Sequence, residues 1–181
     1  DSRFSGPDGS PIKSSSAAEY RGVQTRIGTT RTVIVTPRPY VTDNRCTLDA
    51  IAQLGLSAAR GIAVIHPSIT DAELTRLDDG GIRGIRFTVG DPAVAVTSID
   101  MIEPLAQRIK RLGWHVQFLL DIEDHPGIDS FLGAFPTEVV IDHMGRPDPK
   151  KGVNAPGFQA LIRLLQSGRG WSKMSAPYRT S

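Results

Sequence analysis

The stretch TEVVIDHMGRPDPKKG, from Thr137 to Gly152, contains the pattern that decides the fold. Its short apolar run, 139–141, would be apolar on both faces of a strand, as in a parallel sheet that helices cover on both sides. The run ends in Asp142 and His143, and the chain then turns at once through a Gly-Arg-Pro sequence. We therefore expect a buried strand that delivers polar side chains to the loop after it.

The same pattern recurs along the chain. Apolar or β-branched segments predict six strands, at 30–37, 61–67, 81–88, 115–121, 138–142 and 171–177. Helical patterns predict helices at 16–28, 43–55, 70–81, 98–113, 126–135 and 156–168, with Asp43 or Asn44 and Thr70 as N-caps. This alternation favours βαβ units with a parallel sheet. We expect one domain over residues 1–181, with a loop-like N-terminal segment at 1–16 that is rich in Ser, Gly and Pro.

Two α/β architectures fit this alternation. A doubly wound sheet usually carries a glycine-rich phosphate loop, and no strand exit here has one. A (β/α)₈ barrel carries polar residues at the carboxyl ends of its strands. That feature recurs here, at Thr36, Arg38, His66, Arg86, Thr88, Asp121, Asp142, His143 and Ser175. Because a barrel needs eight strands and about 250 residues, the sequence predicts an open sheet or an incomplete barrel.

Composition limits the function classes. Lys and Arg outnumber Asp and Glu by only 21 to 19 and are spread along the chain, which argues against a nucleic-acid partner. Cys46 is the only cysteine, so an internal disulfide and a thiolate-rich metal site are excluded, and a reducing, cytoplasmic location is expected. The sequence contains no run of about 18 apolar residues, so we expect no membrane span.

His143 is the strongest catalytic candidate. An imidazole at the end of a buried strand can ligate a metal, move a proton or donate to a developing oxyanion, although it could also be a structural histidine bonded to a loop carbonyl. Asp142 should point the opposite way by strand alternation and organise the loop. His66, which also ends a strand, is a second-rank candidate.

Three further side chains are candidates for substrate binding. Arg86 and Arg146 carry planar, forked donors that suit carboxylates, although either could instead form an ion pair with a neighbouring acid, such as Asp121 in the case of Arg86. Gln117 lies on a polar face of its strand, and such a face in a buried sheet more often lines a site than fills a core. Lys173 is costly to bury and should pair with an acid, and we leave it outside the predicted site.

The segments VVIDHMGRPD, GIRGIRFT, GWHVQFLLD and WSKMSAPYR together resemble the amidohydrolase-2 group of the amidohydrolase superfamily. Within it they are most similar to the lactonases that act on 2-pyrone-4,6-dicarboxylate. The resemblance implies a (β/α)₈ TIM barrel of the metal-dependent-hydrolase type, with His143 in the active site and with Arg86, Arg146 and Arg179 holding substrate carboxylates. It implies a hydrolase for a small carboxylated lactone in aromatic or sugar-acid catabolism.

The chain departs from the family pattern at several points. The family opens with a strand that carries His-x-His and closes with a strand that supplies a proton-shuttling aspartate. The sequence lacks both, so we interpret it as an interior part of a barrel. The lactonases tend to carry basic residues in the segment that matches VGDPAVAV, which has none here, so a smaller or less acidic lactone is expected. Leu119 stands where the lactonases have a tyrosine, which leaves the identity of the substrate open.

Other functions remain open at this stage. Members of the lactonase subgroup can act without a metal, so we favour none, but a divalent ion such as zinc is possible. A metal-dependent amidohydrolase or decarboxylase is the first alternative. A noncatalytic anion-binding module is the second, and an oligomer is possible.

Overall fold

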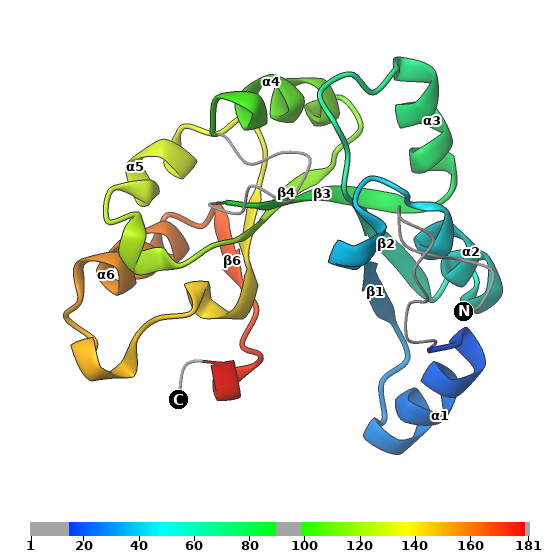
Figure 1. Cartoon of the computed structure of the whole chain (residues 1–181), viewed down its shortest axis with the longest axis horizontal. Helices are drawn as coiled ribbons and strands as arrows, with labels where there is room; N and C mark the ends of the chain where they lie inside the picture. Colours follow the sequence, from blue (N-terminus) through cyan, green and yellow to red (C-terminus); the bar gives the residue numbers. More distant parts are fainter. Residues whose placement is uncertain (1–14, 90–98, 180–181) are drawn as a thin grey trace. The chain divides into compact units, whose positions relative to one another are not determined.

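The structure is a computed structural model that describes residues 15–89 and 99–179. Helices and strands alternate along the described chain, as the sequence predicts (Figure 1). The chain divides into two compact units, with the boundary between Ile85 and Arg86. The single domain over 1–181 stays a prediction, and residues 1–14 of the expected N-terminal loop lie outside the described residues.

The first unit runs up to Ile85. Its elements are α1 (Ala17–Ile27), β1 (Thr32–Val35), η1 (Arg38–Tyr40), α2 (Arg45–Leu54), β2 (Ala59–Ala63), α3 (Asp71–Asp79) and most of β3 (Ile82–Thr88). The strands are parallel, β1 pairing with β2 and β2 with β3. Ser16 and Thr70 form capping boxes with Glu19 and Glu73, so the predicted cap at Thr70 is confirmed.

Asn44 occupies the predicted N-cap position of α2, but its side chain does not cap the helix. Its Oδ1 accepts hydrogen bonds from Thr36 Oγ1 at 2.8 Å and from the backbone N–H of Val64 at 2.9 Å. The side chain therefore joins the exits of β1 and β2. The run 33–35 is apolar at every position, a pattern typical of a strand covered on both faces, but β1 is the edge strand of the described sheet and Val33 is 57% exposed.

The second unit runs from Arg86 onward. Its elements are the end of β3, α4 (Ile99–Lys110), β4 (His115–Leu119), η2 (Ile122–Asp124), α5 (Ile128–Gly133), β5 (Val139–Ile141), η3 (Asp142–Gly145), η4 (Pro149–Lys151), α6 (Pro156–Gln166), β6 (Gly170–Ser172) and η5 (Pro177–Arg179). Strands β4, β5 and β6 are parallel neighbours, with Gln117 beside Val140 and Ile141 beside Ser172. Their carboxyl ends therefore lie side by side.

The core of the second unit packs between these strands and their helices. Helices α5 and α6 lie beside each other on one side of β4–β6 (Figure 1). Phe118 of β4 contacts Phe87 and Phe135, with ring centroids 6.0 and 6.1 Å apart. Burial of these rings fixes the strands that deliver the polar side chains described below. None of the helices in residues 15–89 and 99–179 has the length and apolar character to cross a lipid bilayer.

Gly157 sets the distance between α6 and the η2 turn. A Cβ at this position would lie 2.7 Å from Glu123 Cα and closer still to the carbonyl oxygen of Ile122, both of which are backbone atoms. We expect Gly157→Ala to lower the free energy of unfolding by about 1–3 kcal/mol, because overpacking against backbone cannot relax cheaply. Urea unfolding measures the change.

Gly133→Ala is the matched control, because Gly133 also lies in a helix and has no atom within 4 Å of a Cβ built there. This substitution should be neutral or stabilising, since alanine favours a helix. Equal effects of the two substitutions would contradict the close approach of α6 to η2.

Candidate active site

A polar cluster of Gln117, Asp142 and Lys173 joins β4, β5 and β6 near their carboxyl ends. Gln117 Nε2 donates to Asp142 Oδ2 at 2.9 Å. Lys173 Nζ donates to Gln117 Oε1 at 2.8 Å and lies 3.0 Å from Asp142 Oδ1. Gln117 and Asp142 are 1% and 3% exposed. The cluster therefore fixes the three strand ends and leaves one charge of each sign at this edge.

The Asp142 carboxylate therefore bonds to side chains from the two neighbouring strand segments, those of Gln117 and Lys173. The alternation expected for Asp142 and His143 does not apply, because β5 ends at Ile141 and His143 has a left-handed backbone conformation, with φ 52° and ψ 41°. Asp142 bonds to the β4 and β6 sides, whereas the His143 ring bonds to Ser175. The sequence could not show this, since the turn begins one residue earlier than the predicted strand end.

Arg86 lies in β3, at the beginning of the second unit. The backbone N–H of Val89 donates to the carbonyl of Leu119 at 3.0 Å, which holds the exit of β3 beside the exit of β4. Burial lowers the pKa of the Arg86 guanidinium, and the nearby Asp142 carboxylate partly offsets that shift. Arg86 is therefore a half-buried cation on which the Asp142 carboxylate of the polar cluster acts.

His143 lies next to this cluster, in the turn after β5. Its Nδ1 lies 2.9 Å from the Ser175 hydroxyl, in the segment that follows β6. This hydrogen bond occupies one ring nitrogen and leaves Nε2 as the nitrogen that can act on a ligand. The structure thus brings His143 and Asp142 to one edge of the sheet, as the sequence predicts for these strand-end residues, and Gln117 of β4 contacts Asp142 there.

Arg146 forms an ion pair with Asp121. Its Nε lies 2.8 Å from Asp121 Oδ1, and its second guanidinium nitrogen donates to Asp121 Oδ2 at 3.0 Å. Asp121 therefore pairs with Arg146, for which an ion pair is one of the two interpretations that the sequence leaves open, and the sequence names Asp121 as an alternative partner of Arg86. The Asp121 side chain is 53% exposed, so this ion pair is weak and an incoming carboxylate can compete for Arg146. Arg179 ends η5, and its side chain lies outside the described residues.

Sequence reasoning missed two residues of this site. Lys173 was left out of the predicted site, yet it pairs with Asp142. Ser175 was noted only as a strand-end residue, yet it contacts the His143 ring. The signal for Lys173 was a lysine at the exit of a short strand, where a charge that is partly removed from water gains from an acidic partner. No local signal marks the Ser175 contact, because it joins residues 32 positions apart.

His66, the second-rank candidate, lies in the first unit. Its Nδ1 contacts Ser68 Oγ at 2.8 Å and accepts from the Ser68 backbone N–H at 3.2 Å. The His66 ring therefore stabilises the exposed loop to which it belongs and makes these hydrogen bonds within that loop. Among the described side chains no three or more His, Cys, Asp or Glu residues gather as metal ligands do.

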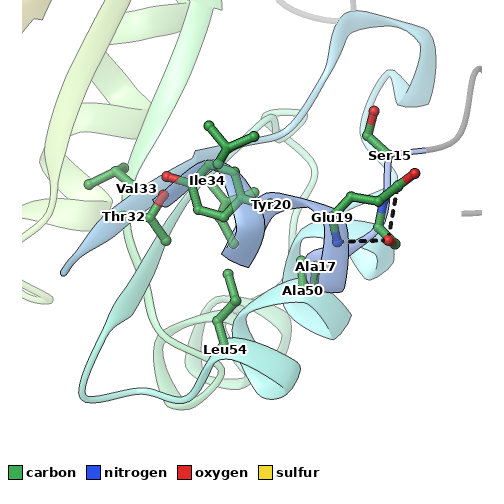
Figure 2. A pocket seen from close by; sticks show the side chains of 11 residues that line it. Ser15, Ala17, Glu19, Tyr20, Thr32, Val33, Ile34, Ala50 and Leu54 are labelled. Carbon is green, nitrogen blue, oxygen red and sulfur yellow. Dashed lines mark hydrogen bonds between the residues drawn. The ribbon is translucent and has the colours of Figure 1, made fainter. Parts of the chain in front are cut away.

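A pocket of about 570 Å³ also lies within the first unit, between α1, β1 and α2 (Figure 2). Its walls include Tyr20, Val33, Ile34 and Leu54, and Glu19 is the one charged residue among those that line it. The Glu19 carboxylate is already bonded to Ser16 in the capping box of α1. This pocket therefore lacks the groups that acid–base chemistry requires, and the β4–β6 edge is the better candidate site.

Comparison with known proteins identifies the family. The family model described as amidohydrolase matches residues 1–181. The chain belongs to the amidohydrolase family. This amidohydrolase shares 40% identity over 167 residues with 2-pyrone-4,6-dicarboxylate hydrolase of Comamonas testosteroni, covering 92% of this chain and 54% of that protein. It shares 28% identity over 179 residues with 4-sulfomuconolactone hydrolase of Rhizobium radiobacter, covering 97% of this chain and 57% of that protein.

A solved structure gives the same answer for the fold. The probable 2-pyrone-4,6-dicarboxylic acid hydrolase of Acinetobacter baumannii superposes on this amidohydrolase with a TM-score of 0.81 and 27% identity. The match covers 94% of this chain and 64% of that one. The chain spans about half the length of the curated relatives it matches. The parallel strands in chain order are therefore part of an amidohydrolase (β/α) barrel, as expected from the sequence.

Proposed function

We propose that the protein to which this chain belongs hydrolyses a small lactone that carries carboxylate groups, with 2-pyrone-4,6-dicarboxylate as the first substrate to test. The observation that carries the proposal is the polar edge after β5, where the His143 ring is held by Ser175 at 2.9 Å and the adjacent Asp142 carboxylate acts on the half-buried Arg86 guanidinium. Two relatives named for lactone hydrolysis support the reaction class. The Acinetobacter relative, solved with citric acid bound, supports an acidic ligand.

In this proposal the substrate carboxylates bind to Arg86, and also to Arg146 and Arg179. Gln117 holds Asp142 and Lys173 in place. Arg86 suits a carboxylate ligand because a guanidinium remains charged when buried and presents paired donors. Arg146 becomes available when a substrate carboxylate displaces the exposed Asp121 carboxylate from it.

His143 acts on the lactone carbonyl. As water adds to the acyl carbon, negative charge develops on the carbonyl oxygen, and an N–H at His143 Nε2 stabilises it. The ring C–O bond then breaks, and a proton from the water ends on the leaving oxygen. The family resemblance implies an aspartate as the carrier of that proton.

The test is ring opening by the full-length protein, which is measured as the loss of the ultraviolet absorbance of the pyrone. In the Arg86→Met variant we expect KM to rise about 10-fold or more, which is the value of one hydrogen bond to a charged group. The dimethyl ester of the same pyrone should show little change between wild type and variant, because it has no carboxylate for Arg86 to bind.

Arg83→Met is the matched control on the same strand. Arg83 bonds to Asp78, in the first unit, with a distance of 2.9 Å, and has no role in the proposed site. Its loss should leave KM for the dicarboxylate unchanged. The proposal fails if folded wild-type protein opens no pyrone ring, or if Arg86→Met raises KM equally for the diacid and the diester.

A further inference from the structure

The turn that carries His143 has an unusual backbone. His143, Met144, Gly145 and Arg146 all have positive φ angles, of 52°, 57°, 71° and 48°. Residues other than glycine adopt this left-handed region only at an energetic cost, and runs of them are rare. Such a turn persists when its surroundings hold it, so the contacts that hold it determine where the His143 ring points.

Those contacts come from the segment after β6. The backbone N–H of Met144 donates to the carbonyl of Lys173 at 3.1 Å. The N–H of Lys173 donates to the carbonyl of Ile141 at 2.9 Å. These two hydrogen bonds join the beginning of the His143 turn to residue 173. Ser175 then closes a tight turn on the same carbonyl, with its N–H donating to Lys173 O at 3.0 Å.

The Ser175 hydroxyl is thereby held in place against the His143 ring. It is half-buried and lies 2.9 Å from Nδ1. A neutral imidazole has one N–H, and the partner of one nitrogen decides whether the proton resides on that nitrogen or on the other. A hydroxyl that donates to Nδ1 leaves the proton on Nε2, which is the form that can donate to a carbonyl oxygen.

We propose that Ser175 is a positioning residue that donates its hydroxyl proton to His143 Nδ1 and thereby keeps the ring in the tautomer with its N–H at Nε2. The functional part of this inference rests on the proposed lactone hydrolysis. The tautomer itself does not, because it can be measured in protein without substrate.

The test is ¹⁵N NMR of the histidine ring nitrogens in the full-length protein, with the His143 signals assigned by their loss in His143→Asn. In wild type, Nδ1 should have the chemical shift of an unprotonated nitrogen and Nε2 that of a protonated one. In Ser175→Ala the two shifts should move toward each other as the tautomers mix. Ser175→Thr retains a hydroxyl and should restore the wild-type pattern.

Steady-state kinetics supplies the second readout. We expect kcat of Ser175→Ala to fall about 5- to 10-fold, the value of one neutral hydrogen bond, with KM within 2-fold of wild type. Ser172→Ala is the matched control, because the Ser172 hydroxyl is buried and has no hydrogen-bond partner among the described residues. It should change neither the tautomer nor kcat.

A wild-type spectrum with the proton on Nδ1 overturns the inference, as does an unchanged His143 tautomer in folded Ser175→Ala. If Ser175→Ala does not fold, the wild-type and Ser175→Thr spectra decide. If the protein opens no lactone while Ser175 still controls the tautomer, the proposed function fails and the positioning role stands.

Discussion

Replacing His143 by asparagine should lower kcat for ring opening by about 100- to 1,000-fold, as expected when a donor to a developing oxyanion is removed. Asparagine is the right replacement because His143 has φ 52°, and asparagine tolerates the left-handed region better than alanine does. The turn after β5 should therefore be retained. Steady-state kinetics measures the loss, and thermal unfolding should show a melting temperature close to that of wild type.

The matched control is His125→Asn. His125 lies in the same unit, in the loop after η2, with an ordinary backbone conformation at φ −132°. Its replacement should leave kcat within 2-fold of wild type. Activity of His143→Asn within a few-fold of wild type would remove His143 from the mechanism.

Removing the Asp142 carboxylate should lower the free energy of unfolding by about 2–3 kcal/mol, because Asp142→Ala leaves Gln117 Nε2 and Lys173 Nζ without their shared partner. The loss should fall short of the largest values for buried ion pairs, since the Lys173 side chain is 34% exposed and can reach water. Urea unfolding with far-ultraviolet circular dichroism measures the change.

Two comparisons test the cause of that loss. The double variant Asp142→Ala/Lys173→Met should be less destabilised than the sum of the single variants, because the second substitution removes the charge that the first leaves unpaired. Asp129→Ala should cost less than Asp142→Ala, since its partner Arg163 is 51% exposed. Strict additivity of the Asp142 and Lys173 effects would show that the two charges do not interact.

Much of the fold follows from the sequence, because its signals are local. The apolar run at 139–141 and the capping threonine at 70 correspond to elements that form where expected. Parallel pairing then places the exits of β4, β5 and β6 together. The prediction that Asp142 and His143 lie at the carboxyl end of a buried strand therefore needed only the strand pattern.

The partners within the site could not be predicted in the same way. Arg146 pairs with Asp121 across 25 residues, and Ser175 contacts His143 across 32. Such contacts depend on where two loops turn, and the left-handed turn after β5 has no sequence signature beyond Gly145. The hydrogen-bond partners of the Asn44 side chain could not be predicted from the sequence either. A residue type that commonly caps helices bridges two strand exits here, because the partly buried N–H of Val64 also needs an acceptor.

The most direct test of the central claim is lactone hydrolysis by the full-length protein in water enriched in ¹⁸O. If water attacks the acyl carbon, the ring-opened product of 2-pyrone-4,6-dicarboxylate should contain one ¹⁸O atom, located in the new carboxylate. The His143→Asn variant should form little of this product. Saturable binding of the pyrone with no product, or a rearranged product without label, would contradict the proposed function.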